Sequence, residues 1–81
     1  MDAATTERLI TLIDKIEAEH GAATRLHIVL EDLSLDADSI RWCMDNETLT
    51  EDEQACADAL LKLSEDDREA LVNRTNYGMI N

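Results

Sequence analysis

Four side chains in this sequence could carry acid–base or nucleophilic chemistry, namely two histidines and two cysteines. Histidine titrates near neutral pH, and a cysteine thiolate can act as a nucleophile or bind zinc. Cys43 and Cys56, however, form no Cys-x-x-Cys pattern and have no zinc-like spacing with His20 or His27. We therefore expect two buried free thiols, two histidines at helix ends or at the edge of the core, and no catalytic or metal-binding residue.

Calcium chemistry is suggested by the acids between Asp32 and Glu47, because Ca²⁺ takes carboxylate oxygens as ligands. In an EF-hand loop that began at Asp36, Glu47 would take the twelfth position, where the loop has a glutamate ligand. Arg41 would take the sixth position, where the sharp turn needs glycine. Glycine-rich phosphate loops and the common hydrolase and metalloprotease motifs are absent from the sequence as well. The sequence therefore predicts no enzyme, no metal and no cofactor.

The tripeptide Asp38-Ser39-Ile40 lies near the middle of the chain, after Val29-Leu30-Glu31-Asp32-Leu33. It resembles the Asp-Ser-Leu site of acyl carrier proteins, a family that is likewise small, acidic and helical. In that family the serine carries a phosphopantetheine arm, so the resemblance implies attachment at Ser39. The sequence departs from the family pattern, since no glycine precedes the motif and residues 41–47 are mostly polar. An acyl-carrier-like protein modified on Ser39 is therefore an alternative prediction.

Acidity dominates the composition. Nineteen acids against seven bases leave a net charge of −12, and residues 31–69 alone hold fourteen acids and three bases, a balance of −11. Such a surface argues against direct binding to nucleic acid or to an anionic membrane, because both need basic residues. Three explanations remain: helix caps and an ordinary solvated face, a compositional bias of the source, and a patch that complements a basic protein surface.

Besides the acids, one aromatic ring is a candidate for binding a partner. Trp42 lies about 200° around its helix from Ile40, so its ring would face away from the core and could anchor a partner. The alternative is that the ring packs under another helix of the same molecule. The predicted partner-binding residues are Trp42, Glu51, Asp52, Glu53, Asp58, Glu65, Asp66, Asp67 and Glu69.

Helices must position these side chains, because the chain has no proline and only two glycines. Apolar residues at spacings of three and four predict helices over about 3–20, 51–63 and 65–76. The last two begin with capping residues, Thr50 followed by Glu53 and Ser64 followed by Asp67.

A heptad seam predicts further helix over about 22–47. The segment can form one continuous helix or two helices with a break near residues 34–36, because Ser34 and Asp36 favour caps over helix interiors. We expect two helical segments in near-continuous register. The seam consists of Leu26, Leu30, Leu33, Ala37, Ile40 and Met44.

These elements predict a single all-α domain over residues 1–81, a small bundle of four or five helices. A chain of 81 residues can form one core and has no room for a second. No stretch approaches the roughly 20 apolar residues of a membrane span, and no signal segment opens the chain. We therefore expect a cytoplasmic protein.

The sequence favours a non-enzymatic interaction protein, an inhibitor or adaptor that docks an acidic face on a basic site of a partner protein. If that site binds nucleic acid, the carboxylates would take the places of phosphates, as in a nucleic-acid mimic. Small phage-encoded inhibitors of host machinery, anti-CRISPR proteins among them, are similar in size and charge, although no motif carries the similarity. The alternatives are the carrier protein modified on Ser39 and a structural or regulatory homodimer that uses the seam from Leu26 to Met44.

Overall fold

Five α-helices follow one another in the computed structural model, which describes residues 3–20, 25–31 and 35–77. No strand occurs within these ranges, so the predicted all-α bundle is confirmed, and none of their helices is both long and apolar enough to cross a membrane. The helices are α1 (Ala3–His20), α2 (Arg25–Glu31), α3 (Ala37–Asn46), α4 (Glu51–Leu61) and α5 (Glu65–Asn73).

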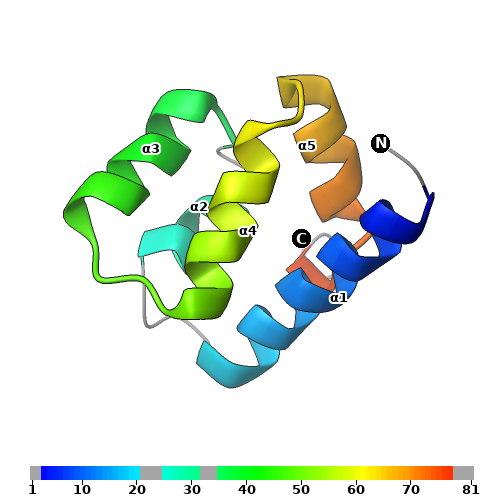
Figure 1. The fold of residues 1–81 in the computed structure, drawn as a ribbon, viewed down its shortest axis with the longest axis horizontal. Coiled ribbons are helices and arrows are strands. Elements are labelled where there is room, and N and C mark those ends of the chain that lie inside the picture. Colours follow the sequence, from blue (N-terminus) through cyan, green and yellow to red (C-terminus); the bar gives the residue numbers. More distant parts are fainter. Residues whose placement is uncertain (1–2, 21–24, 32–34, 78–81) are drawn as a thin grey trace.

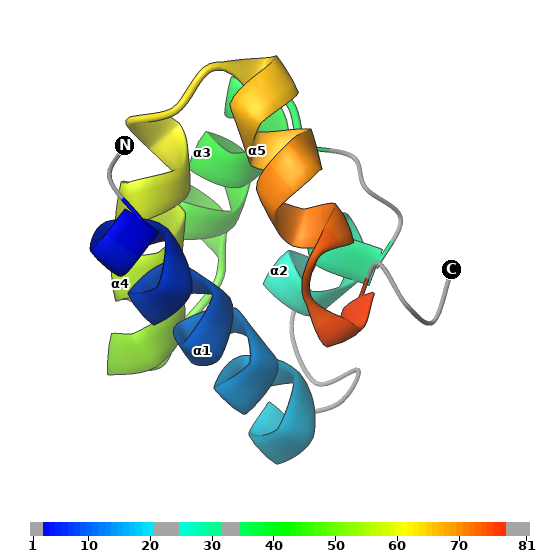
Figure 2. The same cartoon turned by 90° about the vertical axis from the view of Figure 1, so that its right-hand side faces the viewer.

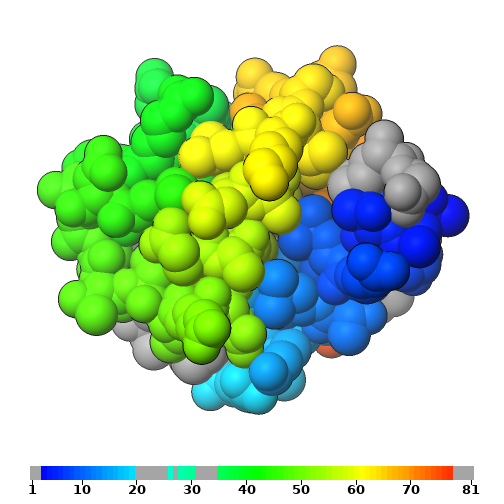
Figure 3. Space-filling model, in the orientation of Figure 1, coloured from blue at the N-terminus to red at the C-terminus, as the bar shows by residue number. Residues whose placement is uncertain are grey.

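Helix α4 lies at the centre of the bundle, where it packs against α1 on one side and α3 on the other (Figure 1). Helix α2 contacts α1 and α3, and α5 packs on α1 (Figure 2). The space-filling view shows α3, α4 and α1 next to one another across one face of the molecule (Figure 3). Helix α3 is thus at the edge of the bundle, with one side open to solvent.

Apolar side chains from all five helices meet in one core. Leu26, Leu30 and Ile40 of the predicted seam are fully buried there, whereas Leu33 lies outside the described residues. The heptad spacing is therefore used within a single chain, and a homodimer through this seam would have to open the core. The buried apolar residues are Leu9, Ile13, Ile16, Leu26, Val29, Leu30, Leu35, Ile40, Cys43, Cys56, Ala57, Leu60, Leu71, Val72 and Tyr77.

The helix predicted over 22–47 is broken, as expected, because α2 ends at Glu31 and α3 begins at Ala37. Asp36 has an extended backbone and caps α3, accepting the Ser39 N–H on its carboxylate at 3.0 Å. Leu35 comes just before this cap and Ile40 four residues after it. Both are buried, as in a hydrophobic staple. Asp36 and Leu35 together fix where α3 begins.

The predicted caps of α4 and α5 are confirmed. Thr50 Oγ accepts the Glu53 N–H at 3.1 Å, and the Glu53 carboxylate accepts the Thr50 N–H at the same distance. Ser64 Oγ accepts the Asp67 N–H at 3.2 Å. These hydrogen bonds satisfy amide groups that the first turn of a helix leaves unpaired.

Both helices end earlier than predicted, α4 at Leu61 instead of 63 and α5 at Asn73 instead of 76. The Lys62 N–H donates to Ala59 O at 3.2 Å, and the Arg74 N–H donates to Leu71 O at 3.0 Å. These bonds span three residues instead of four, so each helix tightens into a final turn and stops.

Candidate interaction surface

The outer side of α3 carries Trp42, whose side chain is 46 % exposed. Ile40 and Cys43, on the opposite side of the helix, are fully buried. At about 100° per residue, Asp38, Trp42 and Asp45 fall on one side of α3, and we call these three residues the outer face of α3. Of the two positions that the sequence left open for Trp42, the structure shows the exposed one, while its role in binding stays a prediction.

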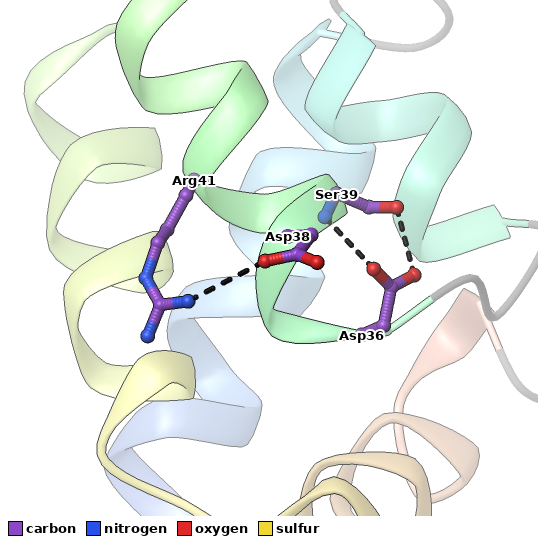
Figure 4. Close-up of polar contacts among 4 residues, drawn as sticks. All are labelled: Asp36, Asp38, Ser39 and Arg41. Carbon is purple, nitrogen blue, oxygen red and sulfur yellow. Dashed lines mark hydrogen bonds and ion pairs between the residues drawn. The ribbon is translucent and has the colours of Figure 1, made fainter.

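Asp36 organises the first turn of α3 (Figure 4). Its carboxylate accepts a hydrogen bond from the Ser39 hydroxyl at 2.8 Å in addition to the one from the Ser39 N–H. Both bonds stabilise the ionised form and lower the pKa of Asp36, the hydroxyl being the larger cause. Arg41 lies 3.6 Å from Asp38 in a solvent-exposed ion pair. The Asp36 carboxylate is thus used in the helix cap, and the Asp38 carboxylate faces solvent.

The first turn of α5 holds three consecutive exposed acids, Glu65, Asp66 and Asp67. Negative charge there interacts favourably with the helix dipole, so local folding accounts for part of this acidity. The starts of α5 and α3 lie at the same end of the molecule, on either side of the last turn of α4 (Figures 1 and 2). We call the carboxylates gathered there the acidic end: Asp36, Asp38, Glu65, Asp66 and Asp67.

A buried arginine holds the acidic end together. Arg68 Nε donates to Leu35 O at 2.7 Å, and Nη1 donates to Leu63 O at 2.7 Å and to Leu60 O at 3.3 Å. The first carbonyl precedes α3, Leu60 O lies in the last turn of α4, where it also accepts the Leu63 N–H, and Leu63 O lies just after that helix. One side chain thereby fixes the point at which α3, α4 and α5 meet. The sequence did not predict this role for Arg68.

Two acids predicted on the surface, Glu51 and Asp52, lie apart from the acidic end. They begin α4, an 11-residue helix whose other end meets α5, so about 15 Å separates the two groups. Asp52 pairs with Lys15 of α1 at 2.9 Å, which raises the pKa of Lys15 through the hydrogen bond and the opposite charge. The predicted acids of α4 and α5 therefore do not form one continuous face.

Glu53 is the clearest correction to the predicted set, because its side chain is fully buried. Its carboxylate belongs to the cap of α4, so it has no exposed surface to offer a partner. Asp58 on α4 and Glu69 on α5 are exposed, as the prediction requires. Exposed acids therefore remain on each of α3, α4 and α5.

Basic side chains neutralise only a small part of this surface. Residues 36–69 hold twelve acids and three bases, which gives −9. Of the three bases, Arg68 is buried, Arg41 pairs with Asp38, and Lys62 sits at the end of α4, where the dipole favours a cation. The part of the chain that forms α3 to α5 is therefore strongly anionic.

Thiol chemistry is suppressed in the described residues. Cys43 and Cys56 are buried and free, as predicted. Burial raises the pKa of Cys56 to about 12, and the negative charge of Glu53 adds to the effect. Such a thiol stays protonated at neutral pH and is a poor nucleophile. His20 and His27 lie in described helices, but the structure does not describe their side chains; among the described residues no group of three metal-ligating side chains occurs.

A depression of about 200 Å³ opens between α1 and α5. Thr6, Asp67 and Arg74 line it together with Ala70 and Leu71. The guanidinium of Arg74 already lies 2.8 Å from the Glu7 carboxylate. Ligand pockets are usually about 300–1,000 Å³ and mostly enclosed, so this depression is small for a substrate site. The candidate site is therefore a surface, made of the acidic end and the outer face of α3.

Comparison with models of known protein families, with curated proteins and with solved structures gives no match. The resemblance to acyl carrier proteins therefore rests only on the residues around Ser39. In the structure the Ser39 hydroxyl donates to Asp36 and the side chain is half-buried in the first turn of α3. A helix-cap role accounts for this serine locally, and its modification stays a prediction.

Proposed function

We propose that this chain is a non-enzymatic interaction protein that docks the acidic end and the outer face of α3 on a basic site of a partner protein. The observation that carries the proposal is the exposure of Trp42 within a segment of net charge −9. The chain has only one other aromatic residue, Tyr77, and that ring is buried. Large aromatic rings are frequent anchors of protein interfaces, because their burial contributes much of the binding energy.

The two parts of this surface have different physical effects. Exposed carboxylates attract a cationic partner over distances of about 8–10 Å and orient it, which mainly raises the association rate. The Trp42 ring acts only on contact, when it leaves water, so it mainly lowers the dissociation rate. Charge would therefore select the partner, and the ring would hold it.

The docked protein acts as an inhibitor when the basic site is one that the partner needs for another ligand. For a partner that binds nucleic acid, the carboxylates of the acidic end take the places of phosphates and compete with them. This is the phage-type, anti-CRISPR-like form of the proposal, supported by size and charge alone. An adaptor that leaves the partner's own site free is the other form, and displacement of the complex by duplex DNA separates the two.

The test compares two variants with the same change in net charge. The partner is first captured from a host extract in about 50 mM NaCl and then purified, so that association and dissociation rates can be measured. The Asp66→Lys, Asp67→Lys protein reverses the acidic end, and Glu17→Lys, Glu19→Lys reverses two acids of α1 as the matched control. We expect the first variant to lose about tenfold in association rate and the control to lose much less.

Two results would count against the proposal. One is an association rate that is the same at about 50 and about 500 mM NaCl. The other is an equal loss of rate in the two variants, which would mean that only total charge matters. Circular dichroism of both variants checks that each keeps its helices. A mass gain with a phosphopantetheinyl transferase that disappears in Ser39→Ala would instead support the carrier alternative.

A further inference from the structure

The outer face of α3 has the chemistry of a receptor for one cationic side chain. Trp42 has Asp38 four residues before it and Asp45 three residues after it, the spacings at which helix side chains become neighbours. The face of an indole ring is electron-rich and attracts cations, and a carboxylate on either side supplies opposite charge. A cation placed over Trp42 would therefore meet three attractive groups at once.

Arginine fits this arrangement better than lysine. Its guanidinium is planar, so it can stack on the ring while its edge donates paired hydrogen bonds to a carboxylate. The lysine ammonium is a compact, strongly hydrated charge that cannot make both contacts with the same geometry. The shape of the three-residue group therefore selects a guanidinium.

Asp38 already contacts a guanidinium within this chain. Arg41 lies 3.6 Å from it, yet the Asp38 side chain remains 97 % exposed and that of Arg41 61 % exposed. The contact is thus single and open to water, and such exposed pairs hold weakly. A partner's arginine can displace Arg41 at small cost, because Arg41 returns to solvent.

A second copy of this chain is a poor occupant of the same face. Each copy carries a net charge of −12, so two copies repel each other, and the repulsion is strongest between their acidic helices. A partner that presents arginine on a cationic surface gains attraction from the same charges. Charge complementarity therefore indicates a different protein as the occupant.

We propose that the outer face of α3 receives an arginine side chain of the partner protein, stacked on Trp42 and held by Asp38 and Asp45. This inference rests on the proposed function and names the group that the partner must present. It makes Trp42 the contact that distinguishes arginine from any other positive charge.

The experiment uses nona-arginine and nona-lysine as probes, because they have equal charge and differ in the cationic group. Trp42 is the only tryptophan, so its fluorescence reports on this face alone. At about 150 mM NaCl we expect nona-arginine to bind about threefold more tightly than nona-lysine and to protect Trp42 from quenching by acrylamide. Titration calorimetry measures both affinities without relying on the ring.

Three variants locate the preference. In Trp42→Leu the affinity for nona-lysine should change little, and the ratio of the two affinities should fall to near one. Asp38→Asn with Asp45→Asn should also reduce the ratio. Glu17→Gln with Glu19→Gln removes the same charge from α1, outside the predicted partner-binding residues, and should leave the ratio unchanged.

An unchanged ratio in Trp42→Leu, or equal acrylamide quenching with and without nona-arginine, would overturn this inference. Neither result touches the proposed function, which is judged by the effect of Asp66→Lys, Asp67→Lys on association with the partner. Conversely, loss of the arginine preference in Trp42→Leu supports the receptor whatever the charge-reversal variants show. The two proposals therefore fail or stand on separate measurements.

Discussion

Two buried charged residues in the described chain, Arg68 and Glu53, serve the fold rather than the surface. A buried charge is costly unless hydrogen bonds replace the lost water. Arg68 has three backbone carbonyls, and Glu53 lies at the positive end of α4, where it accepts the Thr50 N–H. Within the described residues no buried side-chain nitrogen or oxygen lacks a partner. The proposed recognition of a partner therefore depends on the exposed acids and on Trp42.

Replacing Arg68 with methionine tests its structural role, because Arg68→Met keeps an apolar stem and removes the donors. The carbonyls of Leu35 and Leu63 would then lose this donor, whereas Leu60 O would keep the Leu63 N–H at 3.1 Å. An unpaired buried polar group costs about 1–3 kcal/mol, so we expect a loss of about 3 kcal/mol in the free energy of unfolding. Urea denaturation followed by circular dichroism measures it. Arg41→Met is the exposed control, and an equal loss in both variants would contradict the assignment.

The raised pKa of Cys56 predicts its reactivity. A thiol with a pKa of about 12 is almost wholly protonated at about pH 8, and Cys43 is equally buried. We expect an aromatic disulfide reagent to label neither thiol of the folded protein within minutes and both thiols in guanidinium chloride. Rapid labelling of one thiol in the folded state would show that the helix carrying it opens readily.

The same pKa predicts how stability changes in alkali. Between pH 9.0, the ordinary pKa of a thiol, and about pH 12, the unfolded chain loses the Cys56 proton while the folded chain keeps it. The free energy of unfolding therefore falls as pH rises through this interval, by at most about 1.4 kcal/mol per pH unit from this group. The measurement compares the wild type with Cys56→Ala, which isolates the contribution of this thiol. Identical slopes in the two proteins would contradict the prediction.

At the scale of the helices, the starts of α4 and α5 were easier to predict than their ends, whereas α1 ends at His20 as predicted. Thr50, Ser64 and the break before Asp36 are visible in the sequence, because a cap needs a particular side chain a fixed distance from the amide it accepts. The ends of α4 and α5 carry no such signal, since a turn of i→i+3 bonds can form with most residues. The outward position of Trp42 was predictable for a similar reason, because helical periodicity alone gives it.

The site was less predictable than the helices, because packing decides which helix ends meet. Arg68 stands among acids and resembles a surface residue, yet its carbonyl partner Leu35 is 33 residues away. One signal was available, since Arg68 precedes the buried Leu71 and Val72 by three and four residues and so shares their side of α5. The burial of Glu53 depends on the tertiary packing of α4, which no local pattern reveals.

The cap of α4 gives a prediction at this scale. Thr50→Ala removes the acceptor for the Glu53 N–H, and we expect the free energy of unfolding to fall by about 1 kcal/mol. Thr48→Ala, in the loop that precedes the cap, is the matched control and should change it far less. Thermal unfolding of the two variants under one condition makes the comparison. A larger loss in Thr48→Ala would place the start of α4 elsewhere.

At the scale of the whole molecule, net charge opposes folding and, under the proposed function, favours association with a cationic partner. Twelve excess negative charges lie on a molecule with a radius of gyration of 11.2 Å, so most of them are close enough to repel one another at low salt. Among the described residues three ion pairs, Lys15–Asp52, Arg41–Asp38 and Arg74–Glu7, compensate only locally. The molecule therefore keeps a net negative surface charge.

Salt should consequently have opposite effects on folding and on binding. Raising NaCl from about 10 to about 500 mM screens repulsion within the chain, so we expect the melting temperature to rise. The same salt screens attraction to a cationic partner, so the association rate should fall. Circular dichroism during heating measures the first effect, and Asp58→Asn with Glu69→Gln should reduce it because less repulsion remains. A melting temperature that falls with salt would mean that the ion pairs outweigh the net repulsion. The acids would then stabilise the folded chain, and their number would need no partner to explain it.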